Sequence, residues 1–289
     1  MKKISTSIPA AVLIVTMVLC VCMIYSSSCA SQKQPDPLLE YVYADRIVSP
    51  KQHDELVDHL SHEQRVLLWK AMKGEKAEVP ADLTSKELDK ELLWESSHWI
   101  TYPFKDFDYT DIVRACATDL DYPSKDAKYS TTFELEHYIC EKTFETMWDQ
   151  LTIEQREEVL KESGVSASKI AGYACLGGAA MLAATATSAS LMGFAFYILA
   201  AKTIVVAAGA IFSATAATTI TAVSVLAGPV GWCIAAVSAA AGLFLIGGRN
   251  EATTVAYIVQ LHYFKVQAMS NSGIDINQYI PEDISNEKG

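Results

Sequence analysis

The feature that most constrains this chain is a long stretch that carries almost no charge. Residues 170–248 contain a single charged side chain, Lys202, although the whole chain has 23 Lys and Arg and 34 Asp and Glu. More than half of the stretch is Ala, Gly, Ser and Thr. Large apolar side chains favour insertion into a bilayer by about 0.3 to 0.6 kcal/mol each at the centre of a helix, and alanine adds little. The stretch is therefore marginally hydrophobic, and either a bilayer or a sheath of amphipathic helices can accommodate it.

Two interruptions divide the stretch into three apolar segments. The segments are 175–201, 203–227 and 230–248. Because a helix rises about 1.5 Å per residue, each segment is long enough to cross a hydrocarbon core of about 30 Å. Lys202 is expected at the tip of a helical hairpin, and Gly228 and Pro229 are expected in the next turn or at a kink. The alternative is that all three segments form an unusually apolar core.

The side chains expected to enter the bilayer are the large apolar ones of these segments. They are Leu191, Phe194, Phe196, Ile198, Leu199, Ile204, Val205, Val206, Ile211, Phe212, Val230, Trp232, Ile234, Leu243, Phe244 and Leu245.

The N-terminal residues have the pattern of an export signal. Lys2 and Lys3 precede an apolar run over 8–25, and small residues lead to Cys29. This pattern predicts a signal peptide of the lipoprotein type over 1–29, with Cys29 as the lipidated residue. Serine stands where such sites usually carry leucine, so simple cleavage and a retained anchor stay open as alternatives. In each case the chain is expected to be exported, as an envelope lipoprotein or a secreted protein acting at a bacterial membrane.

The rest of the chain predicts an all-α fold, a helical bundle with a long hydrophobic helical hairpin region. Apolar residues outside the charge-poor stretch recur at intervals of three and four, and no strand-like alternation appears. The expected organisation is a linker over 30–36, a polar helical domain over 37–168, hydrophobic membrane-inserting helices over 169–249, and a C-terminal amphipathic helix and tail over 250–289.

Helix starts in the polar domain are marked by capping boxes, in which a Ser or Thr and a Glu or Gln satisfy each other's backbone donors. The boxes are Ser61-x-x-Gln64, Thr131-x-x-Glu134 and Thr152-x-x-Gln155. Further helices are expected near 86–99 and 109–119, and Gly164 is a predicted helix stop.

The cysteine spacing argues against a zinc ribbon or a thioredoxin-like site. None of the seven cysteines forms a CxxC pair. Cys116 and Cys140 can form a disulfide in an oxidising compartment, whereas Cys175 and Cys233 are interpreted as small apolar fillers. The competing interpretation is that all four are buried thiols.

Charge and motif content narrow the classes of function. A net charge of −11 and a pI near 5.0 repel phosphate, so no nucleic-acid partner is expected. Phosphate-binding loops, zinc-protease motifs and nucleophile elbows are absent from the sequence, so neither an enzyme, nor a cofactor, nor a metal site is predicted.

Several histidines and glutamates of the polar domain are candidate site residues. His59 and His62 could bind a metal on one helix face, but Ser61 caps a helix between them. His53 and these two histidines are therefore interpreted as solvated surface residues. Three glutamates of the same domain are interpreted as a solvated helix face rather than an acid and base pair. They are Glu134, Glu136 and Glu141.

Two blocks of sequence resemble a known family. The first runs from Tyr129 to Glu136 and continues through Phe144, Trp148 and Val159-Leu160. The second is Gly228-Pro229-Val230-Gly231, followed by Thr253, Thr254, Val255, Ala256, Ile258 and Leu261. In order and spacing across residues 50–265 they resemble the YaaW-like family of uncharacterised bacterial proteins. That resemblance implies an all-α fold and no particular reaction. By composition alone, the apolar hairpin also resembles the pore-forming domains of colicin-like bacteriocins.

These features together predict a secreted or surface-anchored antibacterial toxin that forms pores in the target membrane. The expected partners are the lipid bilayer, an outer-surface receptor on target bacteria, a cognate immunity protein and, if Cys29 is acylated, an activating protease. The alternative is a resident envelope lipoprotein or membrane protein with a structural or stress-response role and no toxicity. A third class, an enzyme acting on lipid or peptidoglycan, would need a polar constellation that the motifs do not reveal.

Overall fold

The computed structural model describes residues 36–39, 50–73, 77–97, 108–127, 130–188, 192–211 and 249–279. Over these ranges the chain is all-helical and contains no strand. Contacts divide the chain into one unit over Met1–Asp36 and a second over Pro37–Gly289. The second unit includes the polar helices and also the described helices of the charge-poor stretch. None of the described helices is both long enough and apolar enough to cross a membrane.

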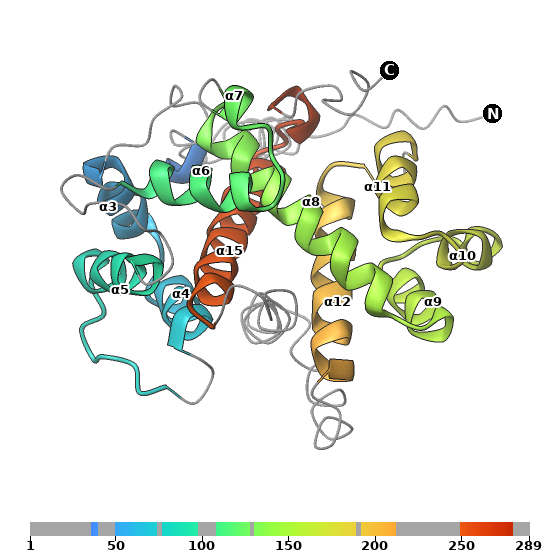
Figure 1. Ribbon diagram of the computed structural model, residues 1–289, viewed down its shortest axis with the longest axis horizontal. Helices are drawn as coiled ribbons and strands as arrows, with labels where there is room; N and C mark the ends of the chain where they lie inside the picture. The colour runs from blue at the N-terminus through green and yellow to red at the C-terminus, as the bar shows by residue number, and fades with distance from the viewer. Residues whose placement is uncertain are drawn as a thin grey trace, which may run out of the picture. The chain divides into compact units, whose positions relative to one another are not determined.

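The helices follow one another along the second unit (Figure 1). They are η1 Pro37–Leu39, α3 Pro50–His59, α4 His62–Lys73, α5 Ser85–Ser97, α6 Tyr109–Asp119, α7 Ser124–Ala127, α8 Thr132–Gln150, α9 Ile153–Glu162, α10 Ala167–Ala174, α11 Gly178–Thr187, α12 Phe194–Ile211, α15 Arg249–Asn271 and η2 Ile276–Tyr279.

Local capping chemistry explains where several helices begin and end. All three predicted capping boxes are confirmed, because each has both reciprocal hydrogen bonds, at the starts of α4, α8 and α9. Gly164 follows α9 with a φ of +82°, a conformation that glycine adopts without strain. The helices expected near 86–99 and 109–119 are α5 and α6.

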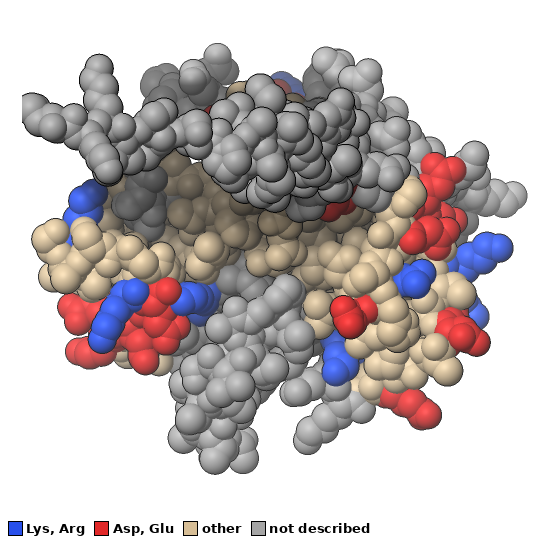
Figure 2. Space-filling model, turned by 180° about the vertical axis from the view of Figure 1, so that it is seen from behind, with Lys and Arg blue, Asp and Glu red and all other residues tan. Residues whose placement is uncertain are grey.

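The centre of the bundle is α15, which packs against α4, α5 and α8 (Figure 1). Every residue from 253 to 266 is buried, including the polar side chains of Gln260, His262 and Lys265. The prediction of an amphipathic C-terminal helix is therefore wrong for this segment, because neighbouring helices cover it on all sides. Charged side chains gather instead on the outer flanks of the described helices (Figure 2).

Lys202 lies within α12 and not at a turn, so the predicted hairpin tip is wrong. Its ammonium group bonds to the backbone carbonyl of Glu162 at the end of α9 and lies 3.5 Å from the carboxylate of the same residue. A charged acceptor thus lets the lysine remain in a helix. The expected single helix over 175–201 is also wrong, because α11 ends at Thr187 and α12 begins at Phe194.

Few of the residues expected to enter a bilayer can be placed. Phe196 and Leu199 are buried in α12, while Phe194 and Ile198 are partly buried there. The side chains of Ile204, Val205, Val206 and Ile211, although these residues belong to α12, lie outside the description. Outside the described residues altogether are Cys29, Leu191, Phe212, Gly228, Pro229, Val230, Trp232, Ile234, Leu243, Phe244 and Leu245.

Three cysteines can be compared with their predictions. Cys116 and Cys140 are free buried thiols, so the disulfide considered between them is absent. Cys175 is exposed at the end of α10 and does not fill the core. Cys233 lies outside the described residues.

Candidate functional site

The described core contains an unusual group of charged and polar side chains, here called the Glu136 cluster. It consists of Glu136 on α8, His262 and Lys265 on α15, and Tyr109 on α6, all buried. Lys265 Nζ and the Tyr109 hydroxyl donate to Glu136 Oε1 over 2.6 and 2.8 Å. Glu136 Oε2 lies 3.0 Å from His262 Nδ1. The carboxylate is therefore fully compensated by one cation and two further donors.

The cluster continues toward α12 through a chain of hydrogen bonds. Because Glu136 is an acceptor, His262 carries its proton on Nδ1, and its Nε2 accepts from the Tyr197 hydroxyl over 3.0 Å. That hydroxyl in turn lies 2.6 Å from His137 Nδ1. His137 Nε2 reaches the carboxylate of Glu141, a partly exposed residue, at 3.3 Å. Tyr197 thus fixes α12 to both α8 and α15.

Burial and charge act in opposite directions on Glu136. Desolvation alone would raise its pKa, but the Lys265 charge and the hydrogen bond from His262 outweigh it and lower the pKa to about 2. Desolvation lowers the pKa of His262 to about 4, against the opposing effect of Glu136. At neutral pH the cluster therefore holds one carboxylate, one ammonium and a neutral imidazole. Burial together with Glu136 also holds the pKa of Tyr109 well above its usual value.

The prediction of a solvated face for three glutamates is wrong for Glu136. Glu134 does serve the N-terminal cap of α8, and Glu141 is partly exposed. Glu136, however, lies at helical spacing with the buried residues Phe133 and Cys140. That position within the apolar stripe was the available signal for burial.

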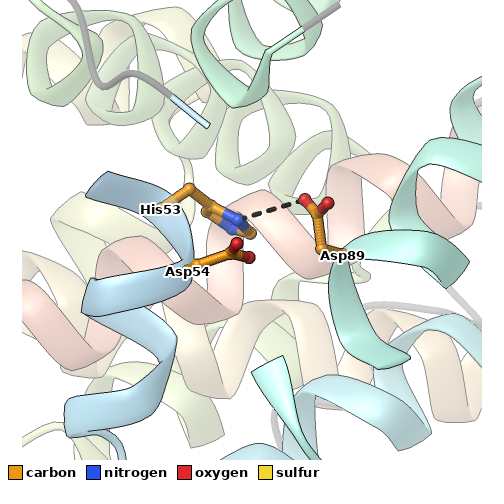
Figure 3. A group of neighbouring side chains, drawn as sticks. All are labelled: His53, Asp54 and Asp89. Carbon is orange, nitrogen blue, oxygen red and sulfur yellow. Dashed lines mark ion pairs between the residues drawn. The ribbon is translucent and has the colours of Figure 1, made fainter. Parts of the chain in front are cut away.

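A second group, here called the His53 cluster, joins α3 to α5 (Figure 3). It consists of His53, Asp54 and Asp89, whose candidate ligand atoms all lie within 4.8 Å of one another. The His53 ring is fully buried and stacks on Tyr109, with the ring centroids 4.5 Å apart. Burial, followed by the charge of Asp89, raises the pKa of Asp54. The contact with Tyr109 places the two clusters next to each other.

The prediction for the N-terminal histidines is wrong for His53 alone. His59 and His62 are exposed, and they belong to different helices because α3 ends at His59 and α4 begins at His62. His53 instead shares the buried face of α3 with Leu56 and Val57, and Leu60, directly after the helix, is buried as well. Its spacing from these leucine and valine residues was the signal that the sequence offered.

The cluster chemistry also sets the relative direction of α12 and α15. Tyr197, near the start of α12, bonds to His262 in the second half of α15, and Phe194 stacks on Tyr263 with the centroids 6.2 Å apart. From these contacts α12 continues to Ile211, while α15 extends back to Arg249. Each of these lengths is roughly 20 Å at about 1.5 Å per residue. The two helices are antiparallel, and the end of α12 and the start of α15 point the same way (Figure 1).

Comparisons with known proteins add no assignment: no protein-family model, no curated protein and no solved structure matches the chain. The resemblance to the YaaW-like family stays a prediction.

Proposed function

We propose that this protein inserts a hydrophobic helical hairpin formed by residues 212–248 into a lipid bilayer, and that it acts as an antibacterial pore-forming toxin. The observation that carries the proposal is the antiparallel pairing of α12 with α15. Between the end of one helix and the start of the other stand 37 residues of sequence, 212–248, without a charged side chain. Because the described helices on either side of this sequence are antiparallel, we infer that it forms a hairpin.

The composition of this segment fits two apolar legs. Gly228 and Pro229 stand near its middle, which leaves residues 212–227 and 230–248 as the legs. At about 1.5 Å per residue, legs of this size approach the roughly 30 Å of a hydrocarbon core. Small residues such as Ala, Gly, Ser and Thr favour close packing of the two legs in lipid.

Two polar contacts tie α12, the helix that precedes the proposed hairpin, to the rest of the bundle. Tyr197 joins α12 to α15, and Lys202 joins α12 to α9. The first contact responds to acid, because a proton taken up by the imidazole of His262 occupies the nitrogen that accepts from Tyr197. Loosening of α12 is the step that we assign to membrane binding.

Efflux from potassium-loaded liposomes is the direct test. We expect the protein to release potassium, and we expect Ile234→Asp and Leu243→Asp to abolish release, because an aspartate at the centre of a membrane helix costs about 3 kcal/mol. Ile153→Asp is the matched control. Ile153 is 50% exposed at the start of α9, so the same kind of substitution there should leave efflux unchanged.

Absence of efflux over a range of pH and lipid composition, with and without limited proteolysis, would contradict the pore. Stable membrane association of the producer's own protein under carbonate extraction, without harm to neighbouring bacteria, would support the resident envelope protein instead. An activating protease, a receptor and an immunity protein belong to the toxin proposal and would have no part in that alternative.

A further inference from the structure

We propose that His53, Asp54 and Asp89 form a binding site for a divalent transition-metal ion, with Zn²⁺ as the ion that their chemistry fits best. The site is separate from the segment proposed to enter the membrane, so either proposal can fail without the other.

The three side chains converge from two helices. His53 and Asp54 are consecutive residues on α3, and Asp89 faces them from α5 (Figure 3). Their candidate ligand atoms lie within 4.8 Å of one another. The helices hold these atoms together through burial, since His53 is fully buried, whereas both carboxylates retain partial exposure. A solvated entrance beside a buried imidazole is suited to the entry of an ion.

Buried atoms without a hydrogen-bond partner within this group favour the binding of a cation. His53 Nδ1 and Asp54 Oδ1 are both buried and have no hydrogen-bond partner among the described residues. His53 Nδ1 lies 3.4 Å from Asp89 Oδ1, yet the two atoms form no hydrogen bond. Buried polar atoms are nearly always paired, because an unpaired one loses its hydration without compensation. A cation between the imidazole lone pair and the two carboxylates would satisfy all three groups.

The other nitrogen of the imidazole has a hydrogen-bond partner of its own, a tyrosine hydroxyl. His53 Nε2 lies 3.1 Å from the hydroxyl of Tyr257 on α15. When Nε2 donates to this hydroxyl, Nδ1 presents its lone pair toward Asp54 and Asp89. Stacking on Tyr109 further fixes the plane of the ring. Such outer contacts orient a histidine ligand and select its tautomer.

The donor set favours a transition metal over Ca²⁺ or Mg²⁺. One imidazole nitrogen and two carboxylates suit Zn²⁺, whereas the two alkaline-earth ions prefer oxygen ligands alone. Zinc bonds of about 2.0 to 2.2 Å require ligand atoms roughly 3.4 Å apart in a tetrahedron. A pair of ligand atoms as far apart as 4.8 Å must therefore approach by about 1.4 Å. The partly exposed aspartates can make this movement, and a water molecule would complete the four ligands.

Metal binding can be measured on the full-length protein after removal of metal with EDTA. We expect calorimetry and elemental analysis to find one Zn²⁺ per chain at micromolar concentrations, with a rise in melting temperature. Asp54→Asn and Asp89→Asn keep the shape of the side chains, and we expect each to weaken binding at least roughly tenfold, in the range found for perturbed metal sites. Asp58→Asn, an exposed carboxylate on the same helix, is the matched control.

A second control separates this site from surface histidines. His59→Gln alters an exposed histidine at the end of the same helix, five residues after Asp54, and should leave the affinity unchanged. The proposal would be overturned if the unaltered chain bound no Zn²⁺, if Asp54→Asn and Asp89→Asn bound it as tightly as the unaltered chain, or if Ca²⁺ or Mg²⁺ bound as well as Zn²⁺. Loss of binding in His59→Gln alone would overturn it as well.

Discussion

Among single residues, Glu136 should have one of the largest effects on stability, because it compensates the buried charge of Lys265. Glu136→Gln leaves the buried ammonium of Lys265 without its carboxylate, and we expect a loss of about 3 to 5 kcal/mol in the free energy of unfolding. Lys265→Met in the same chain removes the uncompensated charge. Because apolar replacements of buried ion pairs are often neutral, the double variant should recover most of the loss.

Denaturant unfolding of the three proteins measures this effect. A double variant no more stable than Glu136→Gln would contradict the argument, since it would show that packing rather than uncompensated charge dominates. Glu141→Gln is the control on the same helix, because that carboxylate is partly exposed and its contact with His137 should contribute much less than the buried pair.

Residues of the candidate site were predictable only in part. Thr131 and Glu134 were identified as a cap because capping depends on neighbours within one turn of helix. Glu136 and His53 were assigned to the surface because their side chains are polar, although both stand within apolar stripes. Their burial depends on Lys265 and Tyr257, which lie far away in the sequence and cannot be paired with them by local pattern.

Where α11 packs against α8, the close approach of the two helices requires a residue without a side chain at position 178. The backbone N–H of Gly178 donates to Asp149 Oδ1 over 2.7 Å, and a Cβ on Gly178 would clash with the backbone carbonyl of Glu145. Since α8 backbone cannot yield easily, Gly178→Ala should lower the free energy of unfolding by about 1 to 3 kcal/mol.

Gly172→Ala gives the matched comparison for that substitution. Gly172 lies within α10 with open space around the position of a Cβ, so alanine there should stabilise the helix by about 0.5 to 1 kcal/mol. Thermal unfolding of both variants checks the pair. Equal effects at the two positions would show that close approach to α8 is not the reason for Gly178.

The sequence predicts where helices begin and end better than it predicts which residues surround them. Starts and stops rest on caps and glycine, as at Ser61 and Gly164, and these are local. The surroundings of α12 and α15 depend on residues that are distant in the sequence. The sequence predicts a turn at Lys202, because a lone charge is costly in an apolar helix. Lys202 can instead lie within α12 because Glu162 on α9 is close to its ammonium group.

The whole molecule should lose stability in acid, and the direction follows from the two shifted groups. His262 has a pKa of about 4 in the fold against an ordinary 6.5, so the unfolded chain binds a proton first as the pH falls. Stability from this group therefore declines between pH 6.5 and 4, by about 3 kcal/mol in total. Glu136, with a pKa of about 2 against 4.5, adds a further decline between pH 4.5 and 2.

Protonation of His262 also acts on the α12 contact, because the added proton occupies the nitrogen that accepts from Tyr197. His262→Gln retains a donor and an acceptor but does not titrate. We expect the free energy of unfolding of this variant to depend on pH less steeply above pH 4.5, by about one proton. Denaturant unfolding at several pH values measures the slope, and an unchanged slope would exclude His262 as the responsible group.

The buried position of α15 has a consequence for the order in which the protein is made. Residues 249–271 emerge from the ribosome after the apolar segment 212–248. The earlier helices α4, α5 and α8 nevertheless need them to complete their packing. Until α15 has been synthesised, these helices lack the partner that covers their apolar side chains. A nascent chain must therefore remain incompletely packed while residues 212–248, a segment without charge, are synthesised, and in this interval it is exposed to aggregation.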